Sequence, residues 1–212
     1  MAVLNKLGNV MKSTVFILNA NDATVTGSSG FDYTYVFEID LLRAYAIEHY
    51  KIQIGALSAF PDTSDSLVDN KLTIQPGYEL DDELGCRLTI YHHGIRDYSL
   101  LFPTVTNLDL RERLGLYYQE AESAFESGSW LSFMLMSGAL FEGMLHHKLG
   151  GNDQFASLIS RINDMSETDI ALIQKIKNFR NLVHASRFNE PYVTRADAMD
   201  IKIILDRMLR TI

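Results

Sequence analysis

The stretch SETDIALIQKIKNFRNLVHASR (residues 166–187) decides the fold of the second half of the chain. Ser166, followed three residues later by Asp169, is typical of a helix N-terminus. The positions after it recur every three or four residues, as on one face of an α-helix: Ile170, Ile173, Ile176, Phe179 or Arg180, and Val183. The stretch is therefore predicted to form one amphipathic helix that packs against other helices.

Other segments of this half carry similar helical signals. Residues 106–127 place apolar side chains at helical spacing after Asn107 or Asp109, either of which suits an N-cap. Three more helices are expected at residues 129–149, 153–163 and 194–212, the first of them closed by Gly150 and Gly151. Residues 107–212 are therefore predicted to form an all-α bundle of four or five helices.

The first half has the texture of β-structure. Short segments rich in β-branched and aromatic residues alternate with Gly, Asn, Asp, Ser and Pro turn signals; they are residues 13–20, 33–39, 50–57, 71–77 and 86–93. The segment DLLRAYAIEHY (residues 40–50) fits a short helix or a strand. We predict a β-rich domain over residues 1–104, a small sandwich or barrel, and an α+β fold for the whole chain.

Composition limits the class of protein. The chain has 212 residues, of which 47% are hydrophobic and 22% charged, which is ordinary for a globular protein. No run approaches the roughly 18 apolar residues that a membrane span requires, and the first residues lack the cleavage site of a signal peptide. A single cysteine, Cys86, cannot form an internal disulfide. A cytoplasmic location and no membrane partner are the expectations.

Positive charge is concentrated in KIKNFRNLVHASRF (residues 175–188), which has four cationic side chains and no carboxylate, in a chain of net charge −8. The half that follows residue 105 carries 12 Lys and Arg against 14 Asp and Glu, a net charge of −2. The overall field therefore repels nucleic acid, and contact with RNA requires a local basic patch. Its candidates are Lys175, Lys177, Arg180 and Arg187. On a continuous helix, Arg180 and His184 would lie one turn apart on the same side.

The helical half resembles the HEPN superfamily, named for higher eukaryote and prokaryote nucleotide-binding domains. The resemblance is carried by the hydrophobic segment SFMLMSGALFEGMLHHKL, the later segment FRNLVHASR and a closing helix, over residues 107–212. The family's hallmark is an arginine, usually followed by a polar residue, with a histidine after four to six intervening residues. Arg180, Asn181 and His184 match it, although only three residues separate Arg180 from His184.

The resemblance implies a metal-independent ribonuclease that acts as a homodimer and needs no cofactor. His184 would transfer protons near neutral pH, Arg180 would bind phosphate oxygens, and Asn181 would orient the phosphate or the histidine by hydrogen bonding. Lys175, Lys177 and Arg187 would contact RNA. No Cys or His pattern typical of a metal site is present: the pairs His92–His93 and His146–His147 are adjacent in sequence and point apart.

Structural interpretations apply to the same residues. Glu142 is the one carboxylate within an apolar helix, and a buried charge needs a partner, so an Arg180–Glu142 ion pair is expected. His184 fits a helix-end histidine, and the lysines fit a solvated face. Three functions therefore remain: a toxin or phage-defence ribonuclease with an antitoxin or sensor partner, a non-catalytic dimerisation, nucleotide-binding or protein-interaction module, and a purely structural bundle.

Overall fold

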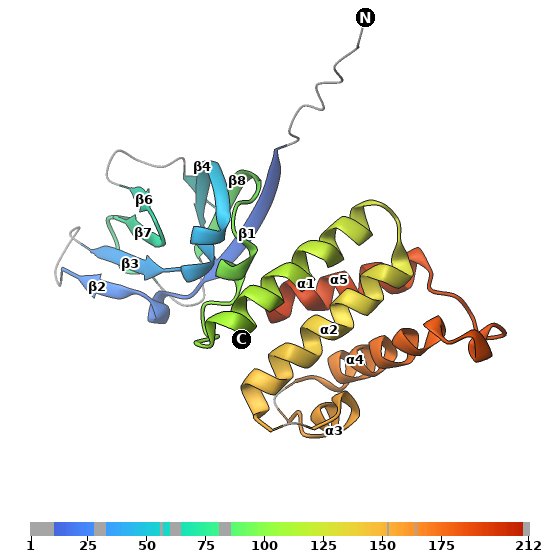
Figure 1. Cartoon of the computed structure of the whole chain (residues 1–212). Coiled ribbons are helices and arrows are strands. Elements are labelled where there is room, and N and C mark those ends of the chain that lie inside the picture. The colour runs from blue at the N-terminus through green and yellow to red at the C-terminus, as the bar shows by residue number, and fades with distance from the viewer. Residues whose placement is uncertain are drawn as a thin grey trace, which may run out of the picture. The chain divides into compact units, whose positions relative to one another are not determined.

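The β-rich part of the chain folds into antiparallel sheets (Figure 1). The computed structural model describes residues 11–27, 33–55, 57–59, 65–80, 86–151, 153–163 and 165–209. Within them, one sheet has the order β1 (Lys12–Leu18), β8 (Cys86–Ile95), β4 (Tyr45–Ile54) and β5 (Leu57–Ala59). The other has the order β2 (Thr24–Thr26), β3 (Thr34–Glu38), β7 (Lys71–Ile74) and β6 (Ser66–Val68).

Both sheets bury one shared hydrophobic core, as in a β-sandwich. Along β8, Leu88 and Ile90 are fully buried, whereas Arg87, which precedes Leu88, is exposed. This is the alternation of a strand that has one face in the core. Phe37 and Leu72 of the other sheet belong to the same cluster. A sandwich was one of the two forms predicted for this half.

The ambiguous segment of residues 40–50 is neither one helix nor one strand. It begins as the 3-10 helix η2 (Asp40–Ala44) and continues as the first half of β4. Asn70 anchors this turn, because its side-chain amide donates to Asp40 Oδ1 at 2.7 Å and its carbonyl oxygen Oδ1 accepts from Arg43 at 3.0 Å.

The second half is helical, so the fold is of the predicted mixed α+β class. Its helices among the described residues are α1 (Leu108–Glu126), α2 (Trp130–Leu149), α3 (Phe155–Ser160), α4 (Glu167–Arg180) and α5 (Arg195–Met208), together with the 3-10 helices η4 (Asn181–Val183) and η5 (Ala185–Arg187). None of these helices combines the length and apolar character that crossing a membrane requires.

Local signals explain where these helices begin. Asn107 rather than Asp109 caps α1, accepting a hydrogen bond from the Leu110 amide at 3.1 Å. Ser166 does the same for α4 through the amide of Asp169. Thr194 and Asp197 form a complete capping box on α5. Helix α2 ends at Leu149, and its C-cap Gly150 adopts φ 68°, a conformation that residues with a side chain tolerate poorly.

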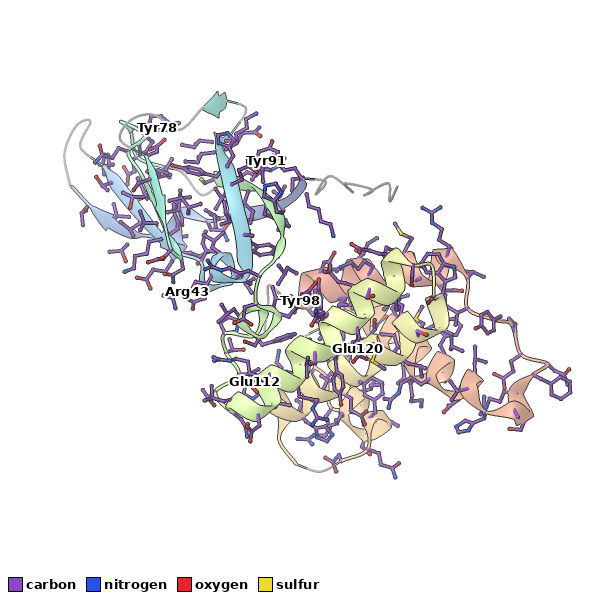
Figure 2. The ribbon with its side chains drawn as sticks, turned by 45° about the horizontal axis from the view of Figure 1, so that its top comes forward. Arg43, Tyr78, Tyr91, Tyr98, Glu112 and Glu120 are labelled. Carbon is purple, nitrogen blue, oxygen red and sulfur yellow. The ribbon has the colours of Figure 1, made fainter. Side chains whose placement is uncertain are left out.

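The chain divides into two units between Asp97 and Tyr98, which is earlier than the expected break at residues 104–107. The difference comes from the 3-10 helix η3 (Tyr98–Leu101), which packs against α1. A Cβ atom on Gly115 of α1 would lie only 2.8 Å from the backbone nitrogen of Ser99. This close backbone approach joins η3 to the helical unit; Figure 2 labels its first residue, Tyr98.

The core of the helical unit takes side chains from α2, α4 and α5, but it does not include Val183, which the sequence placed on the apolar face of the predicted helix over residues 166–187. Phe133, Phe141 and Ile173 are fully buried. Val183 and Ile203, by contrast, are 52% and 58% exposed. Ile203 lies on the outer side of α5, while Val183 lies beyond the end of α4. The expected helix at residues 153–163 is also shorter, because α3 covers only six residues.

Candidate functional site

Arg180, the last residue of α4, forms the ion pair with Glu142 of α2 that the sequence predicts. Its Nη1 donates to Glu142 Oε2 at 2.8 Å. The two side chains remain 32% and 28% exposed, so water still reaches both charges. The pair therefore orients Arg180 without removing it from solvent, and it is worth much less than a fully buried pair.

Two residues that the sequence analysis overlooked hold the arginine side chain in place. Gly138, one turn before Glu142 on α2, leaves space for the Arg180 methylene groups: a Cβ atom there would overlap Arg180 Cδ and approach its Cγ to 3.1 Å. The guanidinium carbon lies 5.4 Å from the centre of the Phe155 ring, a cation–π distance. The spacing of Gly138 and Glu142, four residues apart on one helix, was the available signal.

His184 does not lie on the same helix as Arg180, contrary to the prediction of one continuous helix. The helix ends at Arg180, Asn181 is its C-cap, and a 3-10 turn leads to His184, whose backbone is extended at φ −78° and ψ 126°. The last carbonyls of a helix lack amide partners, and a tighter 3-10 turn is a common way for it to end. Since Val183 reaches no core, no burial favours continuing the helix.

The His184 side chain faces solvent. Among the residues that the structure describes, none forms a hydrogen bond or ion pair with its imidazole ring; its backbone amide donates to the Asn181 carbonyl at 3.1 Å. Asn181 is half-buried, and its side-chain amide likewise has no described hydrogen-bond partner. The imidazole of His184, which has no described partner, thus follows by four residues the guanidinium of Arg180, which Glu142 holds in place.

The other cations expected to contact RNA are mostly paired with carboxylates. Lys175 Nζ lies 2.5 Å from Asp197 Oδ1 of α5, and Arg187 Nη1 lies 2.8 Å from Glu190 Oε1. Only Lys177 of the three has no ion pair with a described residue. The predicted basic patch is therefore largely neutralised within the chain.

The segment that follows His184 exposes large apolar side chains. Phe188 is 81% exposed and Tyr192 66%, and Val183 just before His184 is 52% exposed. Because these exposed apolar side chains are close together in sequence, the segment is a candidate interaction surface. Val193, which is buried, ends this segment where α5 begins.

A second polar cluster, which the sequence analysis missed, ties η3, α1 and α5 together. Lys202 Nζ lies 2.8 Å from Asp206 Oδ1, 3.1 Å from the Tyr118 hydroxyl and 3.4 Å from Glu122 Oε1. The Tyr98 hydroxyl donates to Glu122 at 3.2 Å. Burial, reinforced by the charge of Glu122, raises the pKa of Tyr98 to about 12, so the phenol stays protonated. Because its members bind one another, this cluster is structural.

Comparisons with protein-family models, with curated proteins and with solved structures give no match to this chain. Within the described residues, no group of three or more His, Cys, Asp or Glu side chains is arranged to hold a metal ion. The candidate site is therefore defined by Arg180, Glu142 and His184 themselves, and the HEPN resemblance stays a prediction.

Proposed function

We propose that the helical unit is a metal-independent ribonuclease of the HEPN type, in which Arg180 binds phosphate and His184 transfers protons. The observation that supports this proposal most directly is the solvent-facing imidazole of His184, which has no described partner and follows an arginine fixed by Glu142, Gly138 and Phe155. A histidine that only stabilised the bundle would be expected to pack against it.

The chemistry requires these two groups in different roles. The 2′-hydroxyl of RNA loses a proton, its oxygen attacks the adjacent phosphorus, and the 5′-oxygen leaves and gains a proton. An imidazole suits proton transfer near pH 7, and a guanidinium stabilises charge on the phosphate oxygens. Glu142 accepts from Nη1 alone, so the other donors of Arg180 remain for phosphate. Asn181, which lies between Arg180 and His184 in sequence, orients the phosphate or His184 by hydrogen bonding.

The same proposal includes a homodimer. The exposed side chains of Val183, Phe188 and Tyr192, which are close to His184 in sequence, support it, because burying this segment against a second copy would bring the two His184 residues nearer to each other. A role in toxin–antitoxin or phage-defence systems, with an antitoxin or sensor protein as regulator, is the setting that the family resemblance predicts.

Incubating the purified protein with mixed RNA and a metal chelator tests the proposal. We expect the wild-type chain to cleave RNA and His184→Ala to lose about 10²- to 10⁴-fold of the rate, since one acid or base group contributes this much. His147→Ala, which removes another histidine of the helical unit, serves as the matched control and is expected to retain activity. Equal rates for wild type and His184→Ala, or a rate that the chelator abolishes, would refute this mechanism.

A non-catalytic interaction module is the second candidate. It is favoured by the ion pairs of Lys175 and Arg187, which leave little positive charge for RNA, and by the exposed Phe188. It predicts that neither the wild-type protein nor His184→Ala cleaves RNA. It also predicts that light scattering detects a dimer, which Phe188→Ser disrupts. Leu116→Ser, at another exposed apolar position, is the control.

A further inference from the structure

The outer face of the first sheet combines cations and aromatic rings in a regular array. Strand pairing places nine side chains in three rows across β1, β8 and β4. We call these nine residues the outer face: Ser13, Tyr91 and His49 in the first row, Val15, Thr89 and Lys51 in the second, and Ile17, Arg87 and Gln53 in the third.

Alternation along the strands shows that this face points away from the sandwich core. The residues between them, such as Phe16, Leu88 and Ile52, are buried. Arg87 and His49, in contrast, are exposed. Neighbouring positions on a strand point to opposite sides of the sheet, so the outer face is the side that the core leaves free.

Charge distinguishes this face from the site on the helical unit. None of its nine residues is a carboxylate, in a half of the chain whose net charge is −6. Lys51 and Arg87 form no ion pair with any residue that the structure describes, whereas Lys175, Arg180 and Arg187 each hold one. Lys51 and Arg87 lie diagonally across the β4–β8 pair, and such diagonal neighbours are about 7–8 Å apart.

Aromatic rings complete the array at one end. The His49 and Tyr91 rings are directly opposite across the two strands, with centroids 5.9 Å apart and planes 23° from parallel. Figure 2 labels Tyr91 on β8. Glu48, the carboxylate next to His49, contacts His93. The stacked ring pair thus lies on the same face as Lys51 and Arg87, and Glu48 is paired with His93, two residues beyond Tyr91 on β8.

We infer that the outer face binds single-stranded RNA. Proteins that bind single strands combine cations along the backbone path with rings on which unpaired bases stack, and a sheet surface is a common platform for both. Ser13, Thr89 and Gln53 add hydroxyl and amide groups that can hydrogen-bond to base edges or to the 2′-hydroxyl. This inference rests on the proposed ribonuclease function: the β-rich unit supplies the affinity for RNA that the paired cations of the helical unit lack.

Fluorescence anisotropy with 5′-labelled dodecauridine measures the binding separately from cleavage. Full-length His184→Ala protein keeps the RNA intact during the measurement. We expect it to bind the single strand more tightly than the same strand in a duplex with dodecaadenosine. Tyr91→Thr, which keeps a strand-forming residue, should weaken binding about 5- to 150-fold, as expected for losing one stacked base.

The cations are tested with a matched pair of substitutions. In the same His184→Ala background, Lys51→Gln and Lys71→Gln remove the same charge from the same unit, but Lys71 lies on β7 in an ion pair with Glu38. Lys51→Gln and Arg87→Gln should each reduce the slope of log affinity against log salt by about 0.7, the value for one phosphate contact on a single strand. Lys71→Gln should leave the slope unchanged. Thermal unfolding of each variant confirms that it is folded.

Three results would overturn the inference. The first is that dodecauridine does not bind in 50 mM salt at about 50 μM protein. The second is that Lys51→Gln and Lys71→Gln change the salt slope equally. The third is that polyglutamate competes as well as RNA while Tyr91→Thr leaves the affinity unchanged. The last result would assign the face to an acidic protein partner. Binding by the outer face without cleavage by wild-type protein would refute only the ribonuclease proposal, so the two failures are distinguishable.

Discussion

At the scale of single residues, the position of Arg180 depends on the absence of a side chain at Gly138. The methylene groups of Arg180 occupy the space that a Cβ atom would fill, and Ile176 Cγ2 would lie 3.1 Å from it. A glycine inside a helix costs about 1 kcal/mol relative to alanine. Its presence in α2 is explained by this close approach.

We therefore expect Gly138→Ala to destabilise the protein by about 1 kcal/mol net, because overpacking of about 1–3 kcal/mol exceeds the gain in helix propensity. In an Arg180→Ala background the cost of Gly138→Ala should fall by at least about 0.5 kcal/mol. Urea unfolding of the four proteins of this cycle measures the coupling. Gly143→Ala, whose Cβ atom would meet Leu114 at 2.7 Å, should cost the same in both backgrounds. A coupling of zero for Gly138 would contradict the role assigned to it.

At the scale of elements, the start of α5 is joined to α4 by one carboxylate. Asp197 closes the capping box with Thr194 and accepts from Lys175 of α4. Burial raises the pKa of Asp197. The hydrogen bonds from Lys175 and Thr194 together lower this pKa by more than burial raises it, so the pKa lies below its ordinary value. A carboxyl group with a depressed pKa stabilises the folded state above its unfolded pKa of about 4, and this stability is lost as the pH falls through the folded pKa.

Asp197→Asn should accordingly lower the free energy of unfolding by about 0.5–1 kcal/mol at pH 7, a partly screened effect. The difference from wild type should shrink as the pH falls below about 4. Denaturant unfolding at pH 7 and at successively lower pH checks both statements. Asp200→Asn, at an exposed position of the same helix, is the control and should change stability by less than about 0.5 kcal/mol. A pH-independent difference for Asp197→Asn would show that its charge is not involved.

At the scale of the whole molecule, the position of the boundary determines which fragment folds. Leu101 of η3 and the following Phe102 are 2% and 4% exposed, and they precede the break expected at residues 104–107. Removing a buried leucine or phenylalanine side chain typically costs about 2–5 kcal/mol. The segment that begins at Tyr98 is therefore part of the helical unit rather than a linker.

A fragment of residues 98–212 should unfold cooperatively, and a fragment of residues 105–212 should be at least about 3 kcal/mol less stable or remain unfolded. Circular dichroism during urea titration compares them. The triple substitution Tyr98→Phe, Leu101→Ala and Phe102→Ala in the longer fragment separates lost packing from lost length. Equal stability of the two fragments would restore the later boundary.

The sequence by itself determined the features that depend on neighbours along the chain. Helix starts at Ser166 and Thr194 follow from hydrogen bonds that span three residues, and strand alternation follows from a period of two; for α1 the sequence left Asn107 and Asp109 as alternative caps. The Arg180–Glu142 pair was also predictable, because a lone carboxylate in an apolar helix requires a cationic partner.

Only the tertiary structure decided the features that depend on distant residues. The α4 helix ends at Arg180 because Val183 meets no core, which a count of apolar positions does not reveal. Lys175 forms an ion pair with Asp197 of α5, and the pairing of strands β4 and β8 brings Lys51 beside Arg87. Charge pairing and strand pairing join residues tens of positions apart, and their free energies depend on burial and distance. The order of residues along the chain gives neither burial nor distance. Which charges of the site are paired is therefore decided by tertiary packing.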